Sequence, residues 1–359
     1  MADILIIGGG VAGVTAAARL AEDASVTLLE AEPALGYHAS GRSAAIFIAQ
    51  YGNETIRALN HASLAEHRET DGGVLTRRGL MLVGRPQERA AFEAEAAAND
   101  MAPITVAEAR AAVPILHPVT CAYAAWYDEA YDMDTHRIME SARKRARSLG
   151  VEIVTGARVT AIRRTDGHWE VETAGRSFRA ATLVNAAGAW ADEVAAMAGA
   201  RPMDIRPFRR SMARLPAPGG ADTSGWPFID GVNESWYAKP DTGGLLVSPS
   251  EEDPVAPHDA WADDMVLAEG LARYEEMVTA PVTRVETSWA GLRSFAPDRT
   301  PVIGRAPDCP DFFWLAGQGG YGFQTAPAAS RLASDLLMGR SPALPASVVG
   351  ALSPERFAA

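Results

Sequence analysis

The chain is poor in lysine and cysteine. Among its 359 residues, lysine occurs only as Lys144 and Lys239, and cysteine only as Cys121 and Cys309. Because a catalytic Schiff base needs a buried lysine amine, this composition argues against that chemistry. The cysteines show neither metal-binding nor redox spacing, so we expect inert thiols of a reducing compartment and no metal site.

Long apolar runs are also missing. The run Ile4–Ile7 ends at glycines, which makes it too short for a secretion signal, and no run approaches the roughly 18 residues of a membrane helix. The formal net charge of −12 disfavours nucleic acid and anionic membranes as partners. We therefore expect a cytoplasmic protein that uses local arginines to bind any anionic substrate.

The N-terminus carries a nucleotide-binding pattern. An apolar strand leads into the segment 8–13, GGGVAG, then an Ala-rich helix and a second strand that ends in Glu30. Gly8 permits the tight turn, Gly10 lets a pyrophosphate approach the backbone, and Gly13 lets the helix pack closely. The first helical N–H groups, at Val11 and Ala12, then face the phosphates. This context predicts a dinucleotide cofactor whose ribose hydroxyls bond to Glu30.

The rest of the chain alternates between two kinds of structure. The segment 36–45, rich in small residues, is expected to be a loop that leads to a helix. Thr135 is expected to cap a helix that runs to Leu149, and Asp166-Gly167 is a hairpin turn between strands. Further strands are expected at 79–83, 123–127, 151–154, 159–164, 168–173, 182–185 and 313–316, and further helices at 87–98, 263–277 and 325–337.

This order predicts an α/β protein with two domains that are discontinuous in sequence. A Rossmann-type nucleotide-binding domain is expected from residues 1–71, 135–205 and 287–359. An α+β substrate domain with a mixed β-sheet is expected from residues 72–134 and 206–286.

Several motifs resemble the FAD-dependent D-amino-acid oxidase and dehydrogenase family, and within it most closely the bacterial D-arginine dehydrogenases, which accept many D-amino acids. They are GYH…GRSAA at 36–45, VNAAGAW at 184–190, RRS at 209–211, WAGLRSF at 289–295 and QGGYG at 318–322. The resemblance runs from end to end. It implies a Rossmann-type FAD domain with a substrate domain that places a mixed sheet over the flavin, and dissociable FAD although His38 aligns with a flavinylated residue in some members.

The resemblance also implies the substrate site. Arg210 and Arg293 would hold a carboxylate, a role that suits planar, bidentate guanidinium groups; Arg209 is an alternative to Arg210. Tyr51 and Tyr237 would supply hydroxyls, and the backbone at Gly320 would accept a hydrogen bond from the amine. The side-chain pocket would be formed by Ile46, Leu80, Phe228 and Gln324.

The implied cofactor contacts come from seven segments of the chain. Besides Gly8, Gly10, Val11, Ala12, Gly13, Glu30 and Arg293, they are Ala31, Gly41, Arg42, Ser43, Ala44, Ala45, Val159, Ala187, Gly188, Trp190, Gly319, Gly320, Tyr321, Gly322, Phe323 and Gln324. The N-terminus of the last helix would stabilise negative charge on the reduced ring.

Three positions depart from the family's pattern. Leu80 stands where relatives that accept basic side chains carry a glutamate, and Ile46 where they carry a histidine. Because a buried apolar residue does not offset the desolvation of a guanidinium, D-arginine and D-lysine are expected to be poor substrates. Leu246 stands where sarcosine-oxidase-like members carry a lysine that promotes reaction with oxygen, which favours a dehydrogenase.

The resulting hypothesis is oxidative deamination of a small, apolar D-amino acid by hydride transfer to flavin N5, with a quinone or another acceptor in place of oxygen. Oxidation of a secondary amine, of glycine or of a 2-hydroxy acid is the enzymatic alternative. A flavin-holding subunit of a heteromeric dehydrogenase, and a nicotinamide-dependent enzyme, are the others. The oligomeric state is not predicted.

Overall fold

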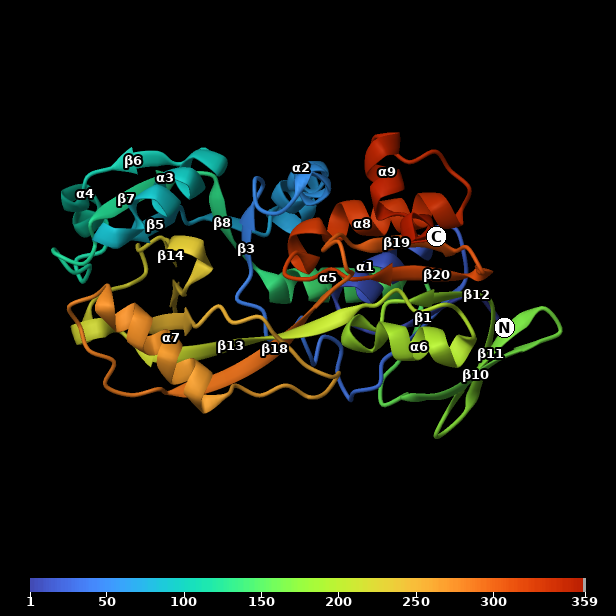
Figure 1. The fold of residues 1–359 in the computed structure, drawn as a ribbon. Helices are drawn as coiled ribbons and strands as arrows, with labels where there is room; N and C mark the ends of the chain where they lie inside the picture. Colours follow the sequence, from blue (N-terminus) through green and yellow to red (C-terminus); the bar gives the residue numbers. More distant parts are fainter. Residues whose placement is uncertain (358–359) are drawn as a thin grey trace.

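The computed structural model describes residues 1–357 and places three β-sheets between and beneath layers of helices (Figure 1). The helices are α1 (Val11–Leu20), α2 (Glu54–Glu69), α3 (Arg89–Ala98), α4 (Val106–Ala112), α5 (Thr135–Ser148), α6 (Ala191–Ala198), α7 (Asp264–Glu276), α8 (Gly322–Leu337) and α9 (Ala346–Leu352). Short 3₁₀ turns join several elements, among them η5 (Val232–Glu234).

An eight-stranded sheet carries the N-terminal motif. Its strands are β1 (Ala2–Ile7), β2 (Val26–Leu29), β9 (Glu152–Val154), β10 (Val159–Thr165), β11 (His168–Thr173), β12 (Ser177–Asn185), β19 (Val302–Ala306) and β20 (Cys309–Ala316). The pairs β9–β2, β2–β1, β1–β12 and β12–β20 are parallel. This parallel core, covered by α1, α5 and α8 in Figure 1, confirms the predicted Rossmann-type architecture.

A nine-stranded mixed sheet forms the other large layer. Its strands are β5 (Leu80–Gly84), β6 (Ala102–Ile104), β7 (Tyr123–Tyr127), β13 (Arg206–Pro216), β14 (Phe228–Gly231), β15 (Tyr237–Asp241), β16 (Gly244–Ser248), β17 (Asp253–Pro254) and β18 (Thr287–Phe295). The pair β14–β5 is parallel and the other pairs are antiparallel. The predicted mixed sheet is therefore present.

Strand β18 corrects one predicted position. Residues 287–295 were expected in the nucleotide-binding domain, but they pair with β13 along their whole length, from Arg206↔Phe295 to Arg214↔Thr287. The backbone hydrogen bonds therefore place this segment in the nine-stranded sheet. The remaining domain boundaries stay a prediction.

A three-stranded sheet connects segments from both predicted domains. It consists of β3 (Ile46–Ile48), β8 (Ala130–Met133) and β4 (Leu75–Arg77), in the order β3-β8-β4. The loop 36–45 thus leads into β3, and α2 follows only afterwards. This small sheet was not predicted, because strands of three residues leave almost no periodicity in a sequence.

Local turn chemistry was predicted more accurately than caps. Asp166 and Gly167 have φ of 51° and 77°, and they join β10 to β11 as expected. The cap of α5, however, is Asp134: its carboxylate accepts a hydrogen bond from the backbone N–H of Arg137 at 2.8 Å. Thr135 is the first helical residue, so its expected role as the cap was wrong.

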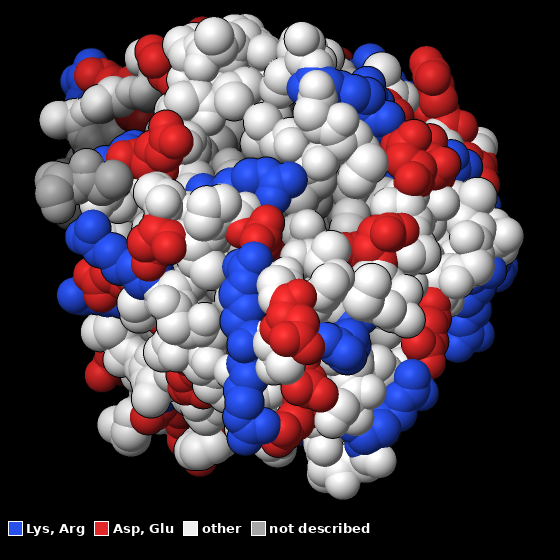
Figure 2. All heavy atoms as spheres, turned by 90° about the vertical axis from the view of Figure 1, so that its right-hand side faces the viewer, with Lys and Arg blue, Asp and Glu red and all other residues white. Residues whose placement is uncertain are grey.

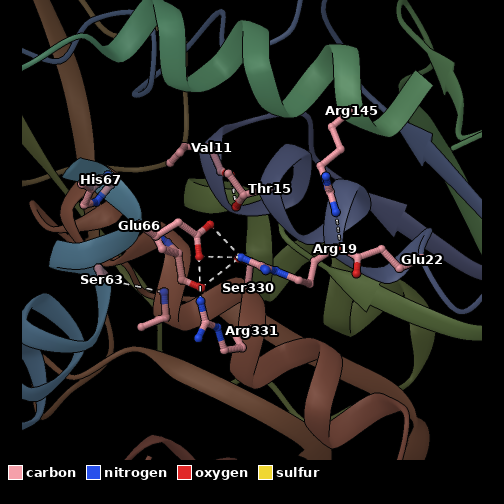
Figure 3. Close-up of polar contacts among 12 residues, drawn as sticks. Val11, Thr15, Arg19, Glu22, Ser63, Glu66, His67, Arg145, Ser330 and Arg331 are labelled. Atoms are coloured by element: carbon pink, nitrogen blue, oxygen red, sulfur yellow. Dashed lines mark hydrogen bonds and ion pairs between the residues drawn. The ribbon is translucent and has the colours of Figure 1, made fainter. Parts of the chain in front are cut away.

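One acid joins three helices that are distant in sequence. Figure 3 shows the Glu66 carboxylate of α2 between Arg19 of α1 and Arg331 of α8, with N–O distances of 2.7 and 2.8 Å. On the same interface the hydroxyl of Ser63 accepts from the backbone N–H of Ala328 at 3.1 Å. These contacts fix the helical layer over the parallel sheet.

The surface is of mixed charge on the face drawn in Figure 2, where acidic and basic side chains are interspersed and a narrow column of basic side chains runs down the middle with acidic ones beside it. Within residues 1–357, no helix combines the length and apolarity that crossing a bilayer requires.

Candidate active site

The Gly-rich turn after β1 is closely packed. Gly8 has φ +111°, and a Cβ there would lie 2.3 Å from the carbonyl oxygen of Ala186, at the end of β12. A Cβ on Gly13 would lie 1.9 Å from the carbonyl oxygen of Gly8. Helix α1 therefore begins directly against the turn, with Gly10 at its N-cap, and the hydroxyl of Ser40 accepts from the first helical N–H, that of Val11, at 2.9 Å.

Glu30 holds its carboxylate beside this turn. It is buried at the end of β2, Oε2 accepts from the backbone N–H of Gly9 at 2.7 Å, and Oε1 accepts from that of Glu32 at 2.8 Å. An acid fixed at the edge of a nucleotide-binding turn is positioned as a ribose contact requires. That contact remains a prediction.

A single large cavity of about 980 Å³ extends from this turn to the nine-stranded sheet. Of the residues predicted from the sequence for cofactor or substrate, all line it except Gly13 and Gly41. Gly13 packs on Gly8, and the backbone N–H of Gly41 donates to the carbonyl of Gly36 at 2.6 Å. Both glycines therefore allow two backbone segments to approach closely.

Two basic side chains fix the loop 36–45 along the cavity. The guanidinium of Arg42 donates to the carbonyls of Ala260 at 2.7 Å and Ala290 at 3.0 Å, and it pairs with Asp259. Lys239, which the sequence did not single out, donates to the carbonyl of Ala45 at 3.0 Å. The charged end of Arg42 thus bonds to protein groups, while Arg42 also lines the cavity, and its predicted cofactor contact stays a prediction.

Two neighbouring arginines on β13 face opposite ways. Arg210 lines the cavity with 7% of its surface exposed, and its Nη2 donates to Glu252 at 3.2 Å. Its Nε and Nη1 are buried without hydrogen-bond partners. Arg209 does not line the cavity and pairs with Asp253 at 2.8 Å. Because alternate strand residues point to opposite faces, only Arg210 presents donors to the cavity.

Arg293 comes from the adjacent strand β18. Burial acts to lower the pKa of its guanidinium. The larger combined effect of Tyr51, Tyr237 and the acids Glu234 and Glu252 raises this pKa above its usual value, so the group stays charged. A Cβ on Gly320 would lie 3.1 Å from Arg293 Cζ. The glycine therefore lets the backbone after β20 lie against the guanidinium.

Aromatic residues complete this end of the cavity. The hydroxyl of Tyr51 donates to Glu234 Oε1 at 3.1 Å, and its ring lies 5.2 Å from that of Tyr321. Burial raises the pKa of Tyr51, so its hydroxyl keeps its proton. Tyr237 stacks on Phe228 at 5.1 Å between ring centroids. These side chains supply neutral donors and flat apolar surface.

The predicted side-chain pocket is a connected apolar cluster. Leu80 and Phe228 are buried in one cluster, and Ile46 packs against it. Gln324 lines the cavity too, but its Oε1 accepts from the backbone N–H of Ile48 at 2.8 Å. Leu246 is buried in the same cluster and does not line the cavity.

Among the acids of the cavity lining that the sequence analysis missed are Glu95, Asp230 and Glu234. Asp230 follows Phe228 by two residues on β14, which places both on one face. The alternation of residues along this strand could have indicated Asp230 from the sequence. Glu234 is brought in by backbone of positive φ, +49°, which no sequence pattern indicated.

A glycine-rich turn at a parallel sheet, a buried acid beside it and a cavity shared with a second sheet define a dinucleotide-dependent enzyme. The family model described as FAD-dependent oxidoreductase, DAO, matches residues 3–336. The chain therefore belongs to the DAO family of FAD-dependent oxidoreductases.

Curated relatives share part of the sequence. The bifunctional protein ThiO/ThiG of Synechocystis is 28% identical over 65% of this chain and 34% of its own length. The hydrogen cyanide synthase subunit HcnC of Pseudomonas aeruginosa is 26% identical over 58% of this chain and 48% of its own. The bifunctional MnmC of Thiobacillus denitrificans is 26% identical over 99% and 59%. The chain thus spans less than two thirds of these relatives.

Solved structures show the same fold. Glycine oxidase from Geobacillus kaustophilus superposes with a TM-score of 0.83 at 23% identity, covering 99% of this chain and 98% of that one. L-proline dehydrogenase from P. horikoshii gives 0.82 at 23%, over 99% and 97%. Iminodiacetate oxidase from Chelativorans gives 0.81 at 22%, over 98% of each chain.

The residues fit FAD, the cofactor of the family. The cavity lining includes Gly8 and Gly10, which carry no side chain, and the N-terminal residues Val11 and Ala12 of α1. This helix end suits a pyrophosphate, although the Val11 N–H is already bonded to the hydroxyl of Ser40. It ends at the segment 319–322 and the N-terminus of α8, which suits negative charge on a reduced ring. Val159 and Trp190 lie in the same lining.

Proposed function

We propose that the protein is an FAD-dependent amino-acid dehydrogenase that oxidises the Cα–N bond of a D-amino acid to the imino acid, which water converts to the 2-oxo acid. The observation that carries this proposal is the pair Arg210 and Arg293, which reach one cavity from adjacent strands. Two buried guanidinium groups match a carboxylate in charge and in bidentate geometry.

The chain's own residues act mainly by binding and orientation. Arg210 and Arg293 hold the carboxylate, while the hydroxyls of Tyr51 and Tyr237 and the backbone at Gly320 fix the amine and exclude water. The chemistry that bound FAD supplies is acceptance of a hydride at N5. No general base is required at carbon, so placement of the Cα–H is the protein's main contribution.

The resemblance to the D-arginine dehydrogenase group supports the D configuration. An apolar carbon chain in the side chain of the substrate, beside the flavin end of the cavity, is supported by the apolar residues Ile46, Leu80 and Phe228. Leu246, buried away from the cavity in place of a lysine, supports a quinone or another acceptor over oxygen. The two free cysteines support a cytoplasmic location of the protein. The histidine that corresponds to His38 is also present in relatives with dissociable FAD, which supports non-covalent binding of the cofactor.

Two alternatives have specific support. A relative named dimethylglycine dehydrogenase is 26% identical over 58% of this chain; dimethylglycine is an N-alkylated amine, which favours an N-alkylated amine, such as a secondary amine, as the other substrate class. The relative HcnC is a subunit of hydrogen cyanide synthase, which favours a flavin-holding subunit. A substrate that bleaches the isolated chain would exclude the second alternative.

The test is anaerobic bleaching of the purified yellow protein with D- and L-amino acids, N-methyl amino acids and 2-hydroxy acids, followed by oxygen. We expect D-amino acids to bleach the flavin fastest and the reduced flavin to reoxidise slowly in air but rapidly with quinones. Faster bleaching by sarcosine or a hydroxy acid would overturn the substrate, and rapid reoxidation in air would overturn the dehydrogenase assignment.

A further inference from the structure

One face of the nine-stranded sheet combines an apolar surface with a single acid. Asp230 lies opposite Leu82 on β5 and Tyr237 on β15, and Phe228 lies opposite Leu80. All five line the cavity. Since paired and alternate residues share a face of a sheet, Asp230 projects from the surface that Leu80, Leu82 and Phe228 make apolar.

The carboxyl of Asp230 has no partner from the protein at one of its oxygens. Oδ1 is inaccessible to solvent and makes no hydrogen bond among residues 1–357. Burial and the neighbouring Glu234 and Glu95 raise its pKa well above the usual value, against the opposing effect of Arg210 and Arg293. Asp230 as a whole is only partly buried, but a carboxylate oxygen that is both inaccessible and without a partner destabilises a fold, so its place in a cavity indicates that a bound group bonds to it.

A second acid is held at this place by strained backbone. Asn233 and Glu234 have φ of 60° and 49°, which side-chain-bearing residues rarely adopt. The turn is fixed from both sides: the N–H of Asn233 donates to Glu95 Oε2 at 2.8 Å, and Tyr51 donates to Glu234 Oε1 at 3.1 Å. Strain that is maintained beside a cavity is typical of a binding site.

The same cavity is independently built for an anion. Arg210 is more than nine-tenths buried, lines the cavity, and leaves Nε and Nη1 without partners. A ligand that satisfies both groups has a carboxylate for the arginines and a cation or strong donor for Asp230 and Glu234. The apolar surface beside Asp230 suits an aliphatic chain between the two ends.

We propose that the preferred substrate is an amino acid with an aliphatic side chain that ends in a cation, and that Asp230, assisted by Glu234, binds this cation. The proposal rests on the proposed function and specifies its substrate class. It replaces the expectation that basic amino acids are poor substrates. That expectation rested on the apolar residues Leu80 and Ile46, whereas the acid is supplied by the neighbouring strand β14, where Asp230 lies opposite Leu82.

The substrate test compares D-lysine with D-norleucine, which has the same stem and lacks the ammonium group. We expect the kcat/KM of the wild-type holoenzyme to favour D-lysine by about tenfold or more. Asp230→Asn should lower that ratio by about tenfold while D-norleucine changes by less than about threefold. Asp222→Asn, which removes an exposed acid from the loop before β14, is the matched control and should change neither substrate.

A binding test separates this proposal from the reaction itself. 6-Aminohexanoate and hexanoate correspond to D-lysine and D-norleucine without the α-amine, so they bind without being oxidised. Titration of the holoenzyme, followed by the flavin absorbance spectrum, should give a lower Kd for 6-aminohexanoate by about tenfold. Asp230→Asn and Glu234→Gln should each remove most of this difference.

The outcomes are distinguishable. Equal Kd values for the two acids, or equal losses with D-lysine and D-norleucine in Asp230→Asn, would overturn the inference; the second result would assign Asp230 to the α-amine. If no amino acid bleaches the flavin but 6-aminohexanoate binds selectively through Asp230, the proposed reaction fails and the cation site stands. Bleaching by D-norleucine with no preference for D-lysine would support the proposed reaction and overturn the cation site.

Discussion

At the scale of single residues, the site depends on which face of a strand a side chain occupies. Arg209 and Arg210 are adjacent on β13, yet Arg209 pairs with Asp253 while Arg210 lines the cavity with two nitrogens unpartnered. Both are arginines with an acidic neighbour, so composition does not separate them. The alternation of the strand does.

Replacement by lysine should therefore have a large effect on activity at Arg210 and a small one at Arg209. Arg210→Lys removes a bidentate donor and should lower kcat/KM for the preferred amino acid by about 30-fold, or about 2 kcal/mol. Arg209→Lys changes the charge pair on the other face and should remain within about threefold. Steady-state kinetics check both, with Tm values to show that each variant is folded. A larger loss in Arg209→Lys would reverse the assignment of the two residues.

Arg210 and Arg293, which line the cavity, could be selected from the sequence because each lies in a contiguous motif, whereas Tyr51 and Tyr237 came from the family resemblance. The sequence analysis missed Asp230 because no motif marks an acid two residues after Phe228, although strand alternation places both in the cavity. It missed Glu234 for a different reason. Its position depends on a turn of positive φ that is held by Tyr51 and Glu95, residues distant in sequence.

At the scale of elements, the turn between β1 and α1 determines how close a cofactor can come. Gly13 lies in the first turn of α1, and the space for a Cβ there is occupied by the carbonyl oxygen of Gly8, 1.9 Å away. A side chain at this position would push the helix away from the turn and from the edge of the parallel sheet.

We therefore expect Gly13→Ala to weaken FAD binding by about tenfold or more, since displacement of the helix moves the N–H groups that face the pyrophosphate. Gly175→Ala is a suitable control because a Cβ there meets nothing within 4 Å and its φ is not positive. Flavin content after purification and fluorescence titration with FAD measure the effect. Wild-type affinity in Gly13→Ala would show that the helix accommodates the methyl group.

Regular elements were predicted well where a pattern repeats and poorly where pairing partners decide. Strand β11 has the expected bounds, and β9 begins within one residue of its expected start. Helix α8 starts at Gly322, three residues before the predicted Thr325. The sheet β3-β8-β4 and the place of β18 could not be predicted, because they depend on long-range backbone hydrogen bonds between segments that are short or similar in composition.

At the scale of the whole molecule, segments from near both ends of the chain meet in one layer. Helices α1, α2 and α8 come from residues 11–20, 54–69 and 322–337, and Glu66 joins them through Arg19 and Arg331. Burial raises the pKa of Glu66, but hydrogen bonds and charge from the two arginines outweigh it, so the pKa lies below its usual 4.5.

A lowered carboxyl pKa stabilises the fold above the unfolded value, and that stability is lost as the pH falls through the folded value. Glu66→Gln should therefore lower the Tm by about 2 °C at pH 7, and the difference should disappear as the pH falls below 4.5. Glu93→Gln, which breaks an exposed pair with Arg89, should have little effect at either pH. A difference in Tm that is independent of pH would contradict this role.

The ties on the loop 36–45 have a consequence for assembly. Arg42 bonds to Ala260 and Ala290, and Lys239 bonds to Ala45, so the loop that borders the nucleotide is held in shape by side chains and carbonyls of the other layer. Without the nine-stranded sheet, this border would lose these ties and keep contacts to the N-terminal turn, such as the bonds of Ser40 with Val11 at 2.9 Å and of Gly36 with Gly9 at 3.0 Å. Retention of the prosthetic group is thus expected to depend on both layers together.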